Sequence, residues 1–310
     1  MKAPHISSVV VVLMSLFSCA VQAACIEVNS VNTPGDATAS FVISQPGSYC
    51  VANNIVGESG KSGISINSGS QVNNCVAAQN GGVGMEGSND VLVTGCVSSL
   101  NGSHGFQFGG GSILKSCLAY NNGGAGITTS SVSSLTVIDC NAHFNTGFGI
   151  AGPKRTFVTG STGEENRGGG ISVGGSSTVS NCNASGNTGI GIIASAGSAV
   201  TGCTASGNTG DGIQVDNLAR VEGNTCQGNS AGGGDGAGVH ATGRINRIDG
   251  NMSTQNDRGI DIDAGGNFVV RNDASNNTTN YDVVAGNTNA NVETPGANFV
   301  LTRPWANFIH

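Results

Sequence analysis

The sequence predicts an all-β protein in which a unit of about 21 residues stacks repeatedly on itself. Three observations indicate this fold class: a glycine recurs at nearly constant spacing, an apolar–x–apolar step follows it, and Gly, Asn and Ser residues fill the segments between steps. A fixed period of this length is typical of one structural unit packed on its neighbours. The recurring glycines lie 21 residues apart, with one gap of 23 and one of 26, at Gly63, Gly84, Gly105, Gly126, Gly149, Gly170, Gly191, Gly212, Gly238 and Gly259.

The apolar steps predict short strands. Ile213 and Val215, which follow Gly212, are one example, and alternation with period 2 indicates a half-buried strand. Glycine makes up 51 of 310 residues, which disfavours helices. One unit is therefore expected to wrap once around a coil of two or three strands, about 4.8 Å from the next coil. Residues at the same position in successive units form what we call a lane, and a second apolar lane consists of Val72, Val93, Leu114, Val137, Val158, Val179, Val200 and Val221.

An asparagine lane accompanies these strands. Its side-chain amides carry donors and an acceptor, so stacked copies are expected to bond one another or the nearby backbone at each turn. Asparagine also tolerates the left-handed conformation that tight corners require. The lane consists of Asn80, Asn101, Asn122, Asn145, Asn166, Asn187, Asn208 and Asn229.

The repeat resembles a known family. Residues 208–215, with the sequence Asn-Thr-Gly-Asp-Gly-Ile-Gln-Val, are similar to the right-handed parallel β-helix repeat of the pectin-lyase-like superfamily, in its exported bacterial type. The resemblance covers about residues 50 to 285. It implies a single-stranded right-handed parallel β-helix, a solenoid of about eleven 21-residue coils with N- and C-terminal caps. It says little about activity, because that fold carries lyases, hydrolases, epimerases, adhesins and phage tailspikes.

The two ends leave the repeat. Residues 1–23 have a positive start, a short apolar run and small residues at a cleavage position, which predicts a secretory signal and an exported protein, periplasmic or extracellular. Lipoprotein processing at Cys19 is the alternative. We expect an N-terminal cap over 24–55, the β-helix over 56–285 and a C-terminal cap or tail over 286–310.

Nine of the ten cysteines fall into three groups, and the tenth, Cys226, lies two residues later than the ladder position and is expected in the core. Cys19 belongs to the predicted signal. Cys25 and Cys50 bracket the segment before the repeat. We expect them to form a disulfide, because the compartments to which proteins are exported are oxidising. The third group forms a ladder whose Cβ atoms would lie about 4.8 Å apart, whereas a disulfide needs about 3.5–4.5 Å. We therefore expect unpaired, buried thiols, with a metal–thiolate stack as the alternative, at Cys75, Cys96, Cys117, Cys140, Cys182 and Cys203.

The charge balance limits the partners. The formal net charge is −7, which disfavours nucleic acid and anionic membranes. No segment is long and apolar enough for a membrane span. The charge does not exclude polyanionic sugars if a metal ion or a local basic patch bridges them to the protein. We expect a monomer that contacts polysaccharide.

The candidate site lies on the outward face of the strands, in the lane two residues after each recurring glycine. Its last three members are His240, Asp261 and Asp282, with Asp263 further along the same face. Carboxylates stacked about 4.8 Å apart repel one another, so they need a bound cation, a retained proton or a basic neighbour such as Arg258. We take His240, Asp261 and Asp282 as catalytic candidates, and Asp261, Asp263 and Asp282 as candidate Ca²⁺ ligands. A solvated face that blocks end-to-end stacking is the alternative.

The sequence alone does not identify one function. The sequence lacks three signatures: the paired Asp motifs, Gly-His-Gly and basic tripeptide of polygalacturonase-like enzymes, the Asp-Pro-His-Asp of alginate epimerases, and the Arg-x-Pro-x-x-Arg of pectate lyases. We expect a protein that contacts extracellular or cell-wall polysaccharide, binding it or cleaving it as a lyase or hydrolase. A non-catalytic surface or adhesin-like rod and a periplasmic metal-handling scaffold are the alternatives. Ca²⁺ is the one cofactor that the pattern suggests.

Overall fold

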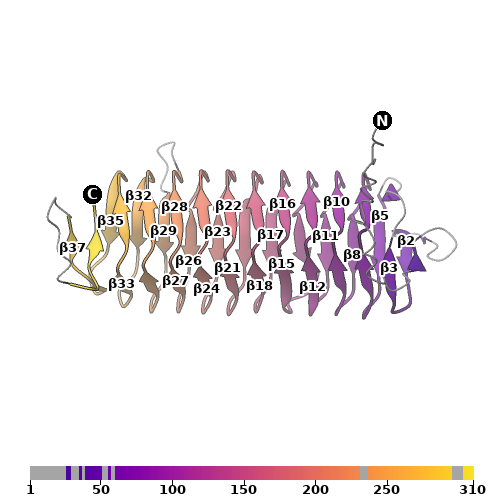
Figure 1. Ribbon diagram of the computed structural model, residues 1–310, viewed down its shortest axis with the longest axis horizontal. Coiled ribbons are helices and arrows are strands. Elements are labelled where there is room, and N and C mark those ends of the chain that lie inside the picture. Colours follow the sequence, from indigo (N-terminus) through magenta and orange to yellow (C-terminus); the bar gives the residue numbers. More distant parts are fainter. Residues whose placement is uncertain are drawn as a thin grey trace, which may run out of the picture.

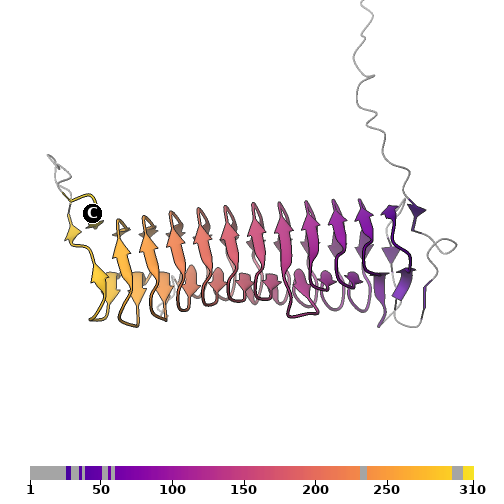
Figure 2. The same ribbon diagram turned by 90° about the horizontal axis from the view of Figure 1, so that it is seen from below.

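The protein is a long rod. A computed structural model describes residues 26–28, 35–36, 39–50, 55–56, 60–230, 236–294 and 303–310, and every regular element in these ranges is a strand. Figure 1 shows short strands repeated along the axis, from the indigo N-terminal end to the yellow C-terminal end. Figure 2, turned by 90°, shows the same coils following one another in chain order. The chain therefore advances one coil at a time until its C-terminal end, where the last strand, β38 (Asn307–Phe308), turns back to lie between β34 (Asp273–Ser275) and β37 (Val292–Glu293).

Three parallel sheets run along the rod. The chain visits them in the order sheet 1, sheet 2, sheet 3 in each coil. Sheet 1 contains β1 (Ile26–Glu27), β3 (Ser48–Cys50), β6 (Gln71–Asn73), β9 (Leu92–Thr94), β12 (Ser112–Lys115), β15 (Leu135–Ile138), β18 (Phe157–Thr159), β21 (Thr178–Ser180), β24 (Ala199–Thr201), β27 (Arg220–Glu222), β30 (Arg247–Asp249), β33 (Phe268–Val270) and β36 (Thr288–Asn289). Sheet 2 contains β4 (Ile55–Val56), β7 (Val76–Ala78), β10 (Val97–Ser99), β13 (Leu118–Tyr120), β16 (Asn141–His143), β19 (Thr162–Glu164), β22 (Asn183–Ser185), β25 (Thr204–Ser206), β28 (Thr225–Gln227), β31 (Met252–Thr254), β34 (Asp273–Ser275), β37 (Val292–Glu293) and β38 (Asn307–Phe308). Sheet 3 contains β2 (Ala39–Ile43), β5 (Ser62–Ile66), β8 (Met85–Gly87), β11 (Phe106–Phe108), β14 (Ile127–Thr129), β17 (Phe148–Gly152), β20 (Gly169–Val173), β23 (Ile192–Ala194), β26 (Ile213–Val215), β29 (Ala237–Ala241), β32 (Arg258–Ile262) and β35 (Thr279–Val283).

The register follows the sequence period. Val179 pairs with Val200, and Ile192 pairs with Ile213, in each case 21 residues further along the chain. The described sheets hold 13, 13 and 12 strands, which corresponds to about twelve turns rather than the eleven expected. The predicted all-β parallel solenoid is confirmed.

The core is built from the predicted apolar lanes. Ile171 and Ile213 of sheet 3 and Val179 and Val200 of sheet 1 are all 0% exposed. Sheet 2 contributes small residues such as Ala184 to the same interior. Because the interior is filled with side chains from all three sheets, the remaining alternate positions point outward and are available for function.

The asparagine lane forms a continuous ladder at the corner between sheets 2 and 3. Asn187 donates from Nδ2 to the Gly163 carbonyl (2.9 Å) and to Asn208 Oδ1 (2.9 Å). Its own Oδ1 accepts from the backbone N–H and the Nδ2 of Asn166. The ladder also explains the recurring glycine: a Cβ at Gly191 would lie 2.6 Å from Asn208 Nδ2. The period therefore reflects close packing between each glycine and the amide of the next coil.

The cysteine lane forms a second ladder at the corner between sheets 1 and 2. The seven described cysteines outside the pre-repeat segment are free and buried: Cys75, Cys96, Cys117, Cys140, Cys182, Cys203 and Cys226. The backbone N–H of Cys203 donates to Asn224 Oδ1 (2.8 Å), where the lane changes from sulfur to amide. The ladder then continues as asparagine through Asn251, Asn272 and Asn307, a continuation that the sequence analysis did not identify.

The ends of the rod add strands to the same sheets. At the C-terminal end, β36 pairs with β33 and β38 pairs with β34. At the N-terminal end, β1 pairs with β3 and β2 pairs with β5. The predicted signal over 1–23 and Cys25 lie outside the described residues, so the disulfide between Cys25 and Cys50 stays a prediction. The capping role of both end segments also stays a prediction.

Candidate functional site

The predicted catalytic residues lie side by side on the outward face of sheet 3. His240 of β29 pairs in register with Asp261 of β32, which pairs with Asp282 of β35. Asp263 follows the end of β32 and lies within bonding distance of His240. The sequence spacing thus located the cluster, because residues in one lane of a parallel coil occupy neighbouring strands.

His240 is held between two carboxylates. Its Nδ1 lies 2.8 Å from Asp211 Oδ2, and its Nε2 lies 2.9 Å from Asp263 Oδ2. Its side chain is only 15% exposed. Burial alone lowers the pKa of His240, but the hydrogen bonds to Asp211 and Asp263 outweigh it and raise the pKa to about 9. The imidazole is therefore protonated at neutral pH.

Asp211 is a member of the site that the sequence analysis missed. It precedes Gly212 by one residue and so lies three residues before the lane that contains His240, Asp261 and Asp282. Its Oδ1 accepts the backbone N–H of Ala237 (2.7 Å), which fixes the carboxylate while Oδ2 faces His240. A charged residue immediately before the glycine is the signal that could have identified it, and Arg258 has the same position before Gly259.

Arg258 joins the two stacked carboxylates. Its Nη1 lies 2.9 Å from Asp261 Oδ2, and its Nε lies 3.2 Å from Asp282 Oδ2. Of the three ways to relieve the predicted repulsion, the structure contains the basic neighbour. Burial raises the pKa of Asp261, and the charges of His240 and Arg258 only partly offset that effect. The side chain of Asp261 is 5% exposed, whereas that of Asp282 is 50% exposed.

Three groups of this cluster could also hold a cation. His240, Asp261 and Asp263 each offer one ligand atom, and these atoms lie within 4.8 Å of one another. One imidazole with two carboxylates is a donor set that suits transition metals better than Ca²⁺, which prefers oxygen ligands alone. Asp282 lies against Arg258 instead of joining this group. The proposed Ca²⁺ set of Asp261, Asp263 and Asp282 stays a prediction.

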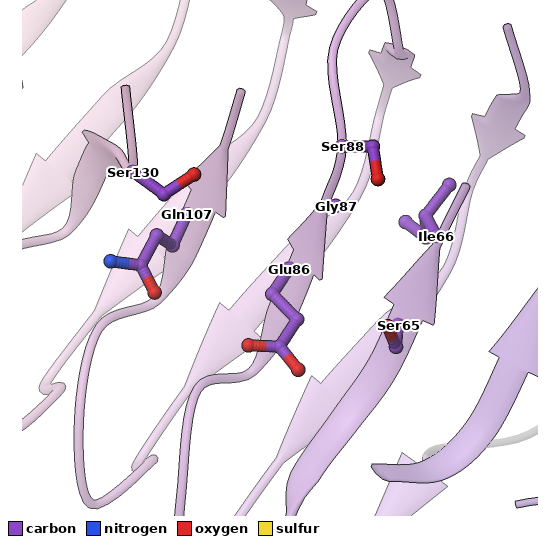
Figure 3. Close-up of a pocket in the computed structure, with 7 residues that line it drawn as sticks. All are labelled: Ser65, Ile66, Glu86, Gly87, Ser88, Gln107 and Ser130. Carbon is purple, nitrogen blue, oxygen red and sulfur yellow. The ribbon is translucent and has the colours of Figure 1, made fainter. Parts of the chain in front are cut away.

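A shallow hollow opens on the same face nearer the N-terminal end. It measures about 160 Å³ and is lined by Ser65, Ile66, Glu86, Gly87, Ser88, Gln107 and Ser130. Figure 3 shows Glu86 and Gln107 as neighbours on the adjacent strands β8 and β11. Its lining is mostly polar side chains and backbone, so the outward face of sheet 3 offers hydrogen-bonding groups well away from His240.

Comparison with known proteins defines the class. Residues 24–153 and 146–295 match the family model described as "Right handed beta helix region", and the chain belongs to this family. No curated protein matches the sequence. Among the described residues, no helix is long and apolar enough to cross a membrane.

Solved structures share the fold at low sequence identity. The A-module of mannuronan C-5 epimerase AlgE6 from Azotobacter vinelandii is 18% identical, with a TM-score of 0.52 over 77% of this chain and 78% of that chain. The A-module of mannuronan C-5 epimerase AlgE4 from the same organism is 16% identical, with a TM-score of 0.52 over 74% of this chain and 76% of that chain. Similarity at this level concerns the fold alone.

Proposed function

We propose that this is an exported β-helix protein that binds polysaccharide along the outward face of sheet 3 and transfers protons at the His240 cluster. One observation carries the proposal: a protonated imidazole, a buried carboxylate and a guanidinium lie together on an open strand face, at His240, Asp261 and Arg258. The neighbours named as mannuronan epimerases support a polysaccharide as the partner.

The cluster contains the groups that cleavage of a glycosidic bond needs. The imidazolium of His240 can donate a proton to a departing glycosidic oxygen, and a carboxylate can accept one from the substrate or from water. The surroundings raise the pKa of both His240 and Asp261, and perturbed pKa values in a cluster of this kind are typical of acid–base sites. Arg258 offsets part of the negative charge of Asp261 and Asp282, which would otherwise repel an acidic sugar.

The test follows the chain length of the polymer. The purified mature protein is incubated with polygalacturonate, mannuronan and a neutral glucan, with and without Ca²⁺ or Mn²⁺, and polymer size is followed by size-exclusion chromatography. We expect shortened chains from at least one polymer, and a loss of at least a hundredfold in rate for the Asp261→Asn, Asp282→Asn double variant. Thr178→Ala, on sheet 1 and so outside the proposed binding face, is the matched control and should retain full activity.

The outcomes separate the alternatives. Full activity in the double variant would remove the acid–base assignment while leaving polysaccharide cleavage in place. Binding without shortening would favour the non-catalytic rod. Activity that depends on an added cation and is lost in Asp263→Asn would favour the second candidate, a cation site, which rests on the convergence of His240, Asp261 and Asp263.

A further inference from the structure

A cluster of aromatic side chains lies far from the His240 cluster, at the corner between sheets 2 and 3. The ring centroids of Tyr120 and His143 lie 5.1 Å apart, and those of His143 and Phe144 also lie 5.1 Å apart. Phe144 packs edge-on against Tyr120, with centroids 6.4 Å apart. We call Tyr120, His143 and Phe144 the aromatic corner.

The coil itself does not require these rings. Tyr120 and His143 occupy the last position of their sheet 2 strands, which in the other coils holds no aromatic residue. The other described members of that lane are Val56, Ala78, Ser99, Glu164, Ser185, Ser206, Gln227, Thr254 and Ser275. An aromatic pair at this point therefore serves something other than the stacking of coils.

Phe144 has an unfavourable backbone conformation for its side chain. Its φ is 57°, in the left-handed region, which this corner adopts in every described coil. Glycine occupies the position at Gly186, Gly207 and Gly228, and other residues occupy it at Gln79, Leu100, Asn121, Glu165, Gln255 and Asn276. The corner imposes this conformation, and a bulky aromatic side chain is less favourable there than glycine. Phe144 is also 50% exposed, so its ring adds little to the buried core. Leu100 shares both properties, with a φ of 57° and 44% exposure, but it has no aromatic neighbours among the described ring contacts.

A hollow opens beside the rings. It measures about 270 Å³ and is lined by Tyr120, Asn121, Phe144, Glu165 and Arg167. Two aromatic rings form its apolar part, and an amide, a carboxylate and a guanidinium form its polar part. This mixture matches a pyranose ring, which has an apolar C–H face and a rim of hydroxyls. The hollow is small and local, whereas a stable protein interface buries about 800 Å² on each partner. The carboxylate of Glu165 and the chain's net charge of −7 disfavour nucleic acid.

We propose that the aromatic corner is a second polysaccharide-binding site that holds one sugar ring against Phe144 and Tyr120. Asn121, Glu165 and Arg167 bond the ring hydroxyls, and Arg167 accommodates a carboxylate where the sugar has one. The inference rests on the proposed polysaccharide function. Four strand steps separate β17, which follows Phe144, from β29, which carries His240, or about 19 Å along the axis. A polymer lying along the rod can therefore contact both sites.

The test combines affinity with stability. Phe144→Gly removes the ring and relieves the left-handed strain, so its thermal midpoint should rise while its affinity for polygalacturonate or mannuronan falls at least fivefold by titration calorimetry. Leu100→Gly is the matched control: the same relief should raise its thermal midpoint and leave its affinity unchanged. Tyr120→Leu should also weaken binding, without the gain in stability.

The outcomes distinguish this inference from the function on which it rests. Wild-type affinity in both Phe144→Gly and Tyr120→Leu, with a binding-competent wild type, would overturn the second site alone. A lower thermal midpoint in Phe144→Gly would show that the ring serves packing, which also overturns it. A wild type that binds none of the polymers would overturn the polysaccharide function and the second site together.

Discussion

At the scale of single residues, the site is a set of charges that hold one another in place. Asp211 and Asp263 bond the two nitrogens of His240, and Arg258 bonds Asp261 and Asp282. The lane of His240, Asp261 and Asp282 was predictable, because the period alone brings its members onto adjacent strands. The contact with Asp211 was not, because it joins residues of different lanes and depends on how each side chain is oriented.

The raised pKa of His240 predicts a pH-dependent contribution to stability. Because its pKa is about 9 in the folded chain and about 6.5 in the unfolded chain, its contribution is complete below pH 6.5 and is lost as pH rises through 9. The expected contribution is about 3 kcal/mol, from 1.4 kcal/mol for each pKa unit. Denaturant unfolding of the wild type and His240→Gln between pH 5.5 and 10 measures it. The two stabilities should converge above pH 9; a constant difference would contradict the assignment.

At the scale of elements, each coil is joined to the next by amide ladders as well as by strand pairing. A buried asparagine inside the ladder uses both its donors and its acceptor, so it adds hydrogen bonds that no apolar residue can replace. The end of the ladder differs. Asn80 donates to Asn101 Oδ1, but its own Oδ1 accepts no hydrogen bond within the described chain.

This difference predicts unequal costs along one lane. Asn187→Ala removes four hydrogen bonds and leaves buried partners unsatisfied, so we expect a loss of about 4 kcal/mol in the free energy of unfolding. Asn80→Ala removes one bond and should cost about 1 kcal/mol. Urea unfolding followed by circular dichroism compares the two. Equal losses would mean that the ladder contributes little beyond the packing of the side chain.

The same ladders show how far the sequence determines the fold. Glycine and asparagine recur with one period because each glycine contacts an asparagine amide of the next coil. The repeat and its strands could therefore be predicted directly from the sequence. Asn224 could be recognised in the cysteine lane from the period, but the continuation of the lane through Asn251 and Asn272 could not. It coincides with the 26-residue unit, where the spacing shifts, and two different residue types perform one structural task.

At the scale of the whole molecule, a rod of stacked coils is most vulnerable at its ends, because a terminal coil has one neighbour instead of two. Near the C-terminal end, Asp249 is fully buried and bonded by both Arg247 and Arg271. Burial alone raises the pKa of Asp249, but the two arginines outweigh it and lower the pKa. Arg271 lies over the ring of Trp305, 5.2 Å from its centroid, and its backbone N–H donates to the Trp305 carbonyl.

This arrangement predicts that Asp249 holds the C-terminal segment on the rod. Asp249→Asn retains the shape but loses the charge that binds both arginines, so we expect a local loss of about 3 kcal/mol. Trp305 is the only tryptophan, so its fluorescence reports this end directly. In the variant, the fluorescence transition should precede the loss of strand signal by circular dichroism, whereas in the wild type the two should lie closer together. Phe268→Leu, which removes only the ring beneath Arg247, is the matched control and should change the order little. Coincident transitions in Asp249→Asn would mean that the rod unfolds as one unit and that Asp249 does not anchor its end.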